Sequence, residues 1–247
     1  MELKGFFERY PKVALAFSGG VDSAYLLYAA KKYGADVKAF FVKSQFQPEF
    51  ELRDAEELAH SLNADMEIIY CDVLADAVVA DNPENRCYYC KHRIFDMLRK
   101  AAGAAGYTCI IDGTNASDLV ADRPGMKALA EMEVLSPLRL CGLTKEEIRS
   151  RSKEAGLFTW NKPSYACLAT RVPAGEKITR EKLQRVEASE KELTALGFSD
   201  FRIRLFSGAA RIQLREDQME KAVELCGAVC QRLKPYFEIV LLDLEGR

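Results

Sequence analysis

Short apolar runs and helical repeats alternate along the first two thirds of the chain. Such runs are typical of buried strands, whereas apolar residues spaced three or four apart are typical of amphipathic helices. Alternation of the two with short connections predicts a parallel sheet covered by helices on both faces, with ligands bound beyond the carboxyl ends of the strands. A short stretch at 134–135 would add a fifth strand. The remaining expected strands are 13–17, 37–42, 66–70 and 109–111, and the expected helices are 22–33, 49–62, a short one within 72–81, one from the CYYC motif to about 105, and 144–154.

The hydrophobic pattern has no clear period at 160–164. After this stretch, the alternation of buried strands and helices gives way to a charged amphipathic helix and a strand pair. We therefore expect a first domain over 1–160 and a C-terminal α+β region over 161–247, joined by this hinge. The second region is too small for a large core of its own, so we expect it to pack against the first or against another subunit. Its expected elements are a helix over 179–196, strands 201–206 and 210–214 paired across Ser207-Gly208, a helix over 217–233, and a last strand over 237–244.

Composition narrows the class of partner. The 247 residues are 49% hydrophobic, which is ordinary for a globular core, and the formal net charge is −2. Without a basic excess, broad nucleic-acid binding is not expected, and a small anionic substrate fits better. No apolar run is long enough for a membrane span, and no signal peptide precedes the first strand, so we expect a cytoplasmic protein.

The most informative stretch is SGGVDS at 18–23, between the first strand and the first helix of the sheet. Two glycines at a helix start expose backbone N–H groups at the positive end of the helix dipole, which forms a seat for phosphates. Ser18 and Ser23 can add hydrogen bonds, and Asp22 can hold Mg²⁺. The stretch is neither a P-loop nor a GxGxxG fingerprint. The structural alternative is a tight turn in which Ser or Asp caps the helix.

The chain has eight cysteines, which in an expected intracellular protein need not form disulfides. Cys226 and Cys230 share a helix face with apolar neighbours, so we expect them in the core. Three further cysteines lie in or beside expected strands or in a short loop, which also favours a structural role. These are Cys71, Cys109 and Cys141.

Cys87 and Cys90 form a Cys-x-x-Cys pair beside a helix start, and Cys167 lies in a polar loop. Three thiolates suit an iron–sulfur cluster that leaves one iron open. Zinc would need a fourth ligand, for which His92 is the nearest candidate. A redox dithiol, or no joint site at all, also fits the spacing.

The chain resembles the LarE family of ATP-dependent sulfur transferases, within the PP-loop ATP pyrophosphatases. SGGVDS alone would specify only that superfamily, but four further blocks match over nearly the whole chain. They are NRCYYCK at 85–91, DGTNASD at 112–118 with RPG at 123–125, KPSYACLATR at 162–171, and FRIR at 201–204. The resemblance implies a Rossmann-like sheet of the adenine nucleotide alpha hydrolase type with a smaller C-terminal region.

The resemblance also implies the substrate, pyridinium-3,5-dicarboxylate mononucleotide, and an AMP-forming reaction. A carboxylate would attack the α-phosphorus of ATP, and sulfur would then displace AMP to leave a thiocarboxylate of the nickel-pincer cofactor pathway. Arginines suit the phosphate and carboxylates of this substrate. The alternative for Arg202 and Arg204 is a solvated strand face, because alternate residues of a strand share a side. The implied sites are Ser18, Gly19, Gly20 and Ser23 for pyrophosphate, Asp22 for Mg²⁺, Ser44, Gly113 and Thr114 for adenosine, and Arg171, Arg202 and Arg204 for substrate.

Members of the family differ in how they supply sulfur. A cysteine in the position of Cys167 is the sulfur donor, and lone-cysteine members sacrifice it. This chain also has Cys87 and Cys90, so the resemblance favours a catalytic 4Fe–4S cluster and leaves sacrificial donation as the alternative. Three competing functions are a tRNA thiolation enzyme, an ATP-dependent amidase or ligase, and a non-enzymatic nucleotide-binding module. The family further implies a homo-oligomer, with a hexamer as one form.

Overall fold

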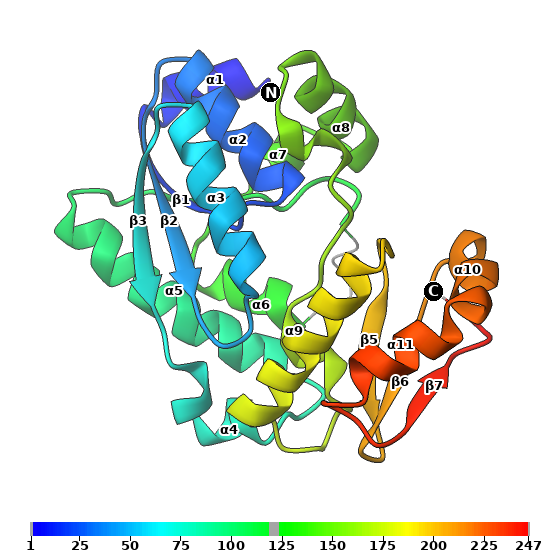
Figure 1. Ribbon diagram of the computed structural model, residues 1–247. Coiled ribbons are helices and arrows are strands. Elements are labelled where there is room, and N and C mark those ends of the chain that lie inside the picture. Colours follow the sequence, from blue (N-terminus) through cyan, green and yellow to red (C-terminus); the bar gives the residue numbers. More distant parts are fainter. Residues whose placement is uncertain (1, 119–123, 247) are drawn as a thin grey trace. The chain divides into compact units, whose positions relative to one another are not determined.

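The computed structural model describes residues 2–118 and 124–246, so Arg123 of the RPG block lies outside the described residues (Figure 1). The chain forms two compact units. The first contains Met1–Val73 and Asn85–Lys162, and the second contains Leu74–Glu84 and Pro163–Arg247. The sequence pattern, by contrast, places 74–84 in the first domain.

Backbone hydrogen bonds explain why the 74–84 segment belongs to the second unit. The amide of Ile178 donates to the carbonyl of Ala80 over 2.7 Å, and that of Gly175 donates to the carbonyl of Asn82 over 2.8 Å. The side-chain amide of the buried Asn82 also donates to the carbonyl of Pro173 over 2.7 Å. These are long-range pairings that no local sequence pattern reveals.

The first unit is built on a parallel sheet, which confirms the expected α/β class. The strand order is β3-β2-β1-β4, so the first strand lies inside the sheet and the phosphate-seat loop leaves its carboxyl end. Ala16 pairs with Asp112 across β1 and β4, which places the 18–23 and 112–118 segments at the same edge. The strands are β1 Lys12–Ala16, β2 Asp36–Lys43, β3 Asp65–Tyr70 and β4 Ile110–Asp112.

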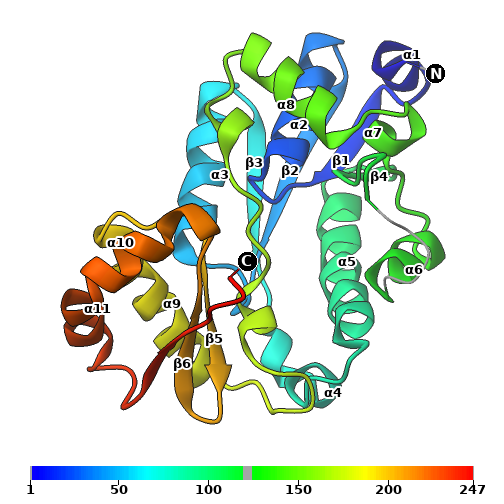
Figure 2. The same cartoon turned by 90° about the vertical axis from the view of Figure 1, so that its right-hand side faces the viewer.

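Helices cover both faces of this sheet. In Figure 2, α2, α3 and α8 lie on one face, and α5 and α6 lie on the other. Alternate residues of a strand therefore point to opposite faces of the sheet. Leu15 and Phe41 pack with α2 in one hydrophobic core, whereas Phe40 is buried but is not part of that core. The helices of this unit are α1 Leu3–Arg9, α2 Val21–Lys32, α3 Glu49–Ser61, α5 Arg86–Ala104, α6 Pro124–Glu131, α7 Pro137–Leu140, α8 Lys145–Glu154 and the 3₁₀ helix η2 Phe158–Asn161.

The expected fifth strand is wrong. Leu135 makes only an isolated parallel bridge to Ile111, although its amide and carbonyl both bond to the β4 region. Glu133 adopts a left-handed backbone with φ 54°, and Pro137 begins α7 two positions after the bridge. The turn on one side and the helix on the other leave no room for a longer strand.

The second unit has a three-stranded sheet in the order β5-β6-β7, and α9 packs on it. The expected hairpin is confirmed: β5 and β6 are antiparallel, and Ser207 and Gly208 between them have φ of 50° and 84°. Left-handed backbone at both turn positions suits the twist of a two-residue hairpin. The elements are α4 Ala77–Ala80, η3 Leu168–Arg171, α9 Arg180–Ala195, β5 Arg202–Phe206, β6 Ala209–Gln213, η4 Glu216–Gln218, α10 Met219–Glu224, α11 Cys226–Leu233 and β7 Val240–Leu242; η1 Val73–Ala75 joins the two units.

Three details of the C-terminal prediction are wrong. The single helix over 217–233 is interrupted at Leu225, so α10 and α11 do not share one continuous face. Val229 and Leu233 are therefore buried on α11, while Cys226 and Cys230 are exposed rather than in the core. The last strand is also shorter than expected, because only Val240–Leu242 pairs with β6.

Within the described ranges, no helix combines the length and apolar character that a bilayer crossing needs.

Candidate functional site

The 18–23 loop has the backbone that a phosphate seat requires. Gly19 has φ 68°, and a Cβ there would lie 3.1 Å from the Cβ of Ala55 and 3.2 Å from the carbonyl oxygen of Glu51. Only glycine fits without strain, because both the left-handed backbone and the close approach of α3 exclude a side chain. Gly20 is the N-cap of α2 and provides no side-chain cap, so the first N–H groups of that helix face the loop.

The two serines of the loop have different surroundings. Ser23 is buried and its hydroxyl donates to the carbonyl of Gly20 over 3.2 Å, while the Ser18 hydroxyl lies 3.1 Å from it. The backbone amide of Ser18 also donates to Ser23 Oγ over 3.3 Å. Ser23 therefore fixes the shape of the loop from inside, and Ser18 is exposed at its surface.

Asp22, the expected Mg²⁺ ligand, already has two polar partners. Its Oδ2 lies 2.5 Å from Lys145 Nζ, and its Oδ1 accepts a hydrogen bond from Asn115 Nδ2 over 3.3 Å. Lys145 opens α8, where Thr144 and Glu147 form a complete capping box. A cation thus reaches the carboxylate at the place where the sequence predicts a metal, so Mg²⁺ would have to join or displace Lys145.

The 112–118 loop packs directly against the phosphate seat. A Cβ on Gly113 would lie 2.9 Å from the backbone nitrogen of Ser23, so this position tolerates only glycine. Thr114 Oγ1 donates to Asp112 Oδ2 over 2.5 Å, and Ser136 Oγ donates to Asp112 Oδ1 over 2.6 Å. The buried Asp112 therefore holds the loop, and Thr114 is committed to it.

Ser44 lies at the carboxyl end of β2, as expected, but it is buried and its hydroxyl donates to Gln47 Oε1 over 2.6 Å. The amide of Phe46 in turn donates to Ser44 Oγ over 3.2 Å. Because the hydroxyl shapes a local turn, a contact of Ser44 with adenosine remains a prediction.

A lysine that the sequence did not single out also touches the phosphate seat. Lys162 Nζ lies 2.6 Å from Asp54 Oδ2 and donates to the carbonyl of Gly19 over 3.3 Å. Arg149 holds the same segment, because its guanidinium donates to the carbonyls of Trp160 and Lys162. Lys162 and Lys145 thus lie at the loop, and each is paired with an aspartate.

Cys87 lies in the first turn of α5 and Cys90 follows three residues later, so the two lie on one side of the helix. Cys87 is exposed and Cys90 is buried. Lys91 follows them, and burial lowers its pKa, although the negative charges of Asp112 and then Cys87 act in the opposite direction. The thiol pair is suited to bind one metal centre beside a half-buried lysine.

His92, the candidate fourth zinc ligand, lies beside Glu131 of α6 instead. Its Nε2 is 3.0 Å from Glu131 Oε2, to which the hydroxyl of Tyr88 also donates over 2.7 Å. The Tyr88 hydrogen bond is the largest cause of a lowered pKa at Glu131. In residues 2–118 and 124–246, no group of three or more His, Cys, Asp or Glu side chains is arranged to hold a metal. The two thiols of Cys87 and Cys90 are suitable ligands for an iron–sulfur cluster. Cys167, the third expected ligand, belongs to the second unit.

Arg171 is completely buried near Cys167, the expected third cluster ligand and alternative sulfur donor. Its Nε donates to Glu190 Oε1 over 2.7 Å, and its Nη1 donates to the carbonyl of Ala166 over 3.1 Å. Glu190 also accepts from the amide of Ile203 and the hydroxyl of Tyr165. The pair therefore fastens the Cys167 loop to α9 and β5, which leaves Arg171 little freedom to reach a substrate.

Arg202 and Arg204 do not form a solvated strand face. Arg202 is buried and donates to the carbonyl of Ser164 over 2.7 Å; Arg204 donates to that of Thr170 over 2.6 Å. Burial, followed by repulsion from Arg171, lowers the pKa of both. The three predicted arginines are thus brought together around 164–171, where Arg171 is paired with Glu190 and the other two bind backbone carbonyls.

The remaining cysteines of the first unit match their expected structural role. Burial raises the pKa of Cys71, Cys109 and Cys141, which favours the unreactive thiol.

The structure gathers the predicted phosphate-seat residues with Gly113 in the first unit, and the three arginines with Cys167 in the second. Sequence reasoning missed Lys145, Lys162, Asn115 and Glu190. Asn115 and Lys162 lie within the recognised DGTNASD and KPSYACLATR blocks, so membership of a motif was a signal for them, whereas Lys145 lies outside every recognised block. Nothing local distinguishes Glu190, on the predicted helix 179–196, from the other acids of that helix.

Comparisons with known proteins show which family the chain resembles. A model of the family described as thiamine biosynthesis protein (ThiI) matches residues 10–195. An uncharacterised protein of Synechocystis is 38% identical over 248 residues, which cover 99% of this chain and 92% of the relative.

Two relatives have named activities. The pyridinium-3,5-bisthiocarboxylic acid mononucleotide synthase of Lactiplantibacillus plantarum is 32% identical over 238 residues, covering 95% of this chain and 86% of the relative. The tRNA-specific 2-thiouridylase MnmA of Thermotoga petrophila is 27% identical over 194 residues, covering 61% of this chain and 54% of the relative.

Proposed function

Because the chain belongs to the ThiI-like PP-loop family that includes pyridinium-3,5-bisthiocarboxylic acid mononucleotide synthase, we propose that it is an ATP-dependent sulfur transferase of that synthase type. Its substrate would be pyridinium-3,5-dicarboxylate mononucleotide, and its product a thiocarboxylate used in nickel-pincer cofactor biosynthesis. The observation that carries the proposal is the 18–23 loop, whose left-handed Gly19 and uncapped α2 support the proposed seat for pyrophosphate.

The first half of the proposed reaction is adenylylation. A substrate carboxylate oxygen attacks the α-phosphorus of ATP, the bond to the bridging oxygen breaks, and pyrophosphate leaves. The loop N–H groups and Ser18 would hold the departing pyrophosphate, and Lys162 would add a positive charge at Gly19. Asp22 is the proposed Mg²⁺ ligand, and Gly113 and Thr114 would line the adenosine.

The second half replaces AMP by sulfur. Sulfur attacks the acyl carbon, the bond to the adenylate oxygen breaks, and AMP leaves with the electron pair. Arg202 and Arg204 are the proposed binders of the substrate phosphate and carboxylates, since guanidinium groups match planar oxyanions. Arg171 would act by holding the Cys167 loop through Ala166.

The proposed sulfur source is a 4Fe–4S cluster on Cys87, Cys90 and Cys167. When bound, such a cluster would supply an iron without a protein ligand, on which exogenous sulfide can be carried. The pairing of Cys87 and Cys90 on one turn of α5 supports this, because a single sacrificial cysteine would need no such pair. Sacrificial donation from Cys167 is the competing route.

A mass-spectrometric assay tests the function. The protein is incubated anaerobically with ATP, Mg²⁺, sulfide and the pyridinium dicarboxylate mononucleotide, and we expect the product mass to show oxygen replaced by sulfur, with AMP and pyrophosphate formed. A parallel reaction contains tRNA, because the similarity to the MnmA protein makes tRNA thiolation the second candidate. Sulfur incorporation into tRNA alone would overturn the proposal.

The C-terminal region, 161–247, is further proposed to contribute to substrate binding and to homo-oligomer formation. Its three buried or half-buried arginines support the first role. Light scattering at several concentrations would test the second, with a hexamer as the expected form.

A further inference from the structure

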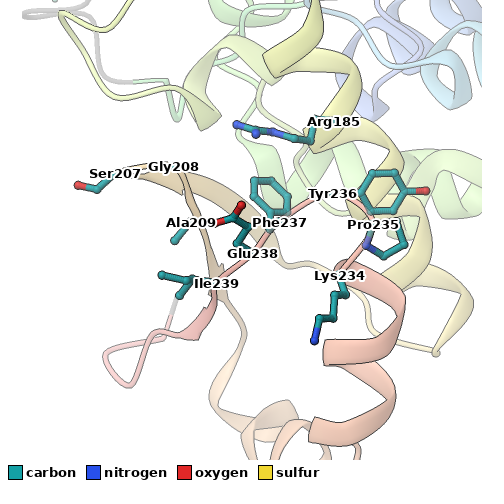
Figure 3. A pocket seen from close by; sticks show the side chains of 10 residues that line it. All are labelled: Arg185, Ser207, Gly208, Ala209, Lys234, Pro235, Tyr236, Phe237, Glu238 and Ile239. Carbon is teal, nitrogen blue, oxygen red and sulfur yellow. The ribbon is translucent and has the colours of Figure 1, made fainter.

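The second unit contains a pocket of about 370 Å³ whose lining residues have no part in the function proposed above. Three segments line it: Arg185 of α9, the hairpin turn at 207–209, and the 234–239 connection between α11 and β7. Figure 3 shows side chains from all three segments around one hollow. Its volume is in the range of small-molecule sites.

Arg185 is the polar anchor of this pocket. Its side chain reaches over the ring of the buried Phe237, with the guanidinium carbon 4.7 Å from the ring centroid (Figure 3). Its Nε is buried and has no hydrogen-bond partner within the described residues. No described residue forms an ion pair with Arg185, so an anionic group of a ligand would give its guanidinium a counter-charge.

The other two charges in the pocket restrict the ligand. The carboxylate of Glu238 points toward the Ala209 side of the hollow, and it forms no ion pair with Arg185 or any other described residue (Figure 3). The ammonium of Lys234 points away from Arg185. The pocket therefore offers one cation and one anion that do not neutralise each other, rather than a cluster of cations.

We propose that this pocket binds a free α-amino acid. The ligand carboxylate would accept hydrogen bonds from the Arg185 guanidinium, and the ligand ammonium would donate to Glu238. A phosphate dianion fits less well because only one cation faces it and Glu238 repels it. A simple amine would leave the Arg185 guanidinium without a counter-charge.

Saturation-transfer NMR on the full chain, with an equimolar mixture of the proteinogenic amino acids as the probe, tests this proposal. Titration calorimetry then measures the strongest binder, its N-acetyl derivative and its decarboxylated amine. We expect each derivative to bind at least about tenfold more weakly than the amino acid, because each loses one hydrogen bond to a charged group. Arg185→Met and Glu238→Gln should weaken binding of the parent amino acid similarly.

Two matched variants control for surface charge: Arg215→Met and Glu224→Gln, both at exposed positions outside the pocket, should leave the affinity unchanged. If Arg185→Met fails to fold, the affinity of Glu238→Gln for the amino acid tests the proposal alone. Glu238 is exposed, so this change should leave the fold intact. The proposal is overturned if no amino acid shows transfer, or if the N-acetyl derivative binds as well as its parent and Glu238→Gln has no effect.

Discussion

Lys145 Nζ lies 2.5 Å from Asp22 Oδ2, although the two residues are far apart in the chain. The contact joins the first turn of α8 to the first turn of α2, at the edge where the parallel strands end. A carboxylate that is expected to hold Mg²⁺ is thus balanced by a lysine. Both side chains remain partly accessible, at 29% for Lys145 and 22% for Asp22.

Asp22→Ala should abolish pyrophosphate release while the fold is retained. The change removes a metal-holding charge from the transition state, and loss of a partly exposed ion pair should cost only about 1 kcal/mol of unfolding free energy or less. Coupled pyrophosphate detection and thermal unfolding measure the two effects. Asp65→Ala, which removes another aspartate paired with a lysine, is the control and should retain activity.

Lys145→Met tests whether Lys145 competes with Mg²⁺ for the Asp22 carboxylate. Removing the competing cation should leave pyrophosphate release in place and lower the Mg²⁺ concentration at half-saturation severalfold. Normal adenylylation by Asp22→Ala would show that Asp22 is not the Mg²⁺ ligand.

Gly113→Ala should distort the phosphate seat. The new Cβ would lie 2.9 Å from Ser23 N, and relief of that overlap should cost about 1–3 kcal/mol of unfolding free energy and weaken ATP binding. Gly103→Ala is the matched control in α5, where no atom lies within 4 Å of the new Cβ. Because alanine favours a helix, Gly103→Ala should stabilise the protein by about 0.5–1 kcal/mol. Equal denaturant midpoints for the two variants would contradict the packing argument.

Arg171→Met should strongly destabilise the protein. It leaves Glu190, only 6% exposed, as an uncompensated buried charge, for which a cost of about 3–5 kcal/mol is typical. Arg232→Met breaks an exposed pair with Glu192 on the same α9 helix and should cost about 1 kcal/mol or less. Chemical denaturation measures both. A similar small effect of the two changes would mean that the Arg171 pair does not hold the Cys167 loop.

Arg204→Ala should weaken binding of the pyridinium substrate while ATP affinity persists. The guanidinium is half-buried beside the Cys167 loop and is proposed to meet the substrate oxyanions. Calorimetric titration with each ligand gives the comparison, and the exposed Arg215→Ala is the control. An equal loss of both affinities would assign Arg204 to structural support.

Cys87→Ala or Cys90→Ala should remove activity almost as completely as Cys167→Ala. Three thiolates are expected to hold one cluster, so the loss of any one should prevent its assembly. Protein reconstituted anaerobically with iron and sulfide should turn brown and catalyse several turnovers when sulfide is supplied. Cys226→Ala, at an exposed cysteine of α11, should change neither iron content nor turnover.

The sacrificial route predicts a different pattern. Only Cys167 would be indispensable, turnover would stop after one sulfur per chain, and the spent protein would be lighter by the mass of hydrogen sulfide. That mass loss in protein with an intact cluster would exclude the catalytic-cluster route but not the proposed ATP chemistry.

Local features of this protein could be predicted from its amino-acid sequence. The apolar runs indicate the parallel strands and their order along the chain, and the glycines of SGGVDS indicate the phosphate-seat loop, because side-chain period and backbone freedom are local properties. The hairpin at Ser207-Gly208 follows from the same kind of signal. The recognised motifs also identify the cysteines and arginines proposed to act in sulfur transfer.

Which polar groups meet became known only from the folded chain. Lys145 pairs with Asp22, Lys162 with Asp54, and Arg171 with Glu190, and each pair joins residues that are distant in sequence. The same holds for the short β7 strand and the exposed Cys226, since a helix face is buried only where another element covers it. Pairing and burial depend on which surfaces come together, and a one-dimensional pattern does not contain that information.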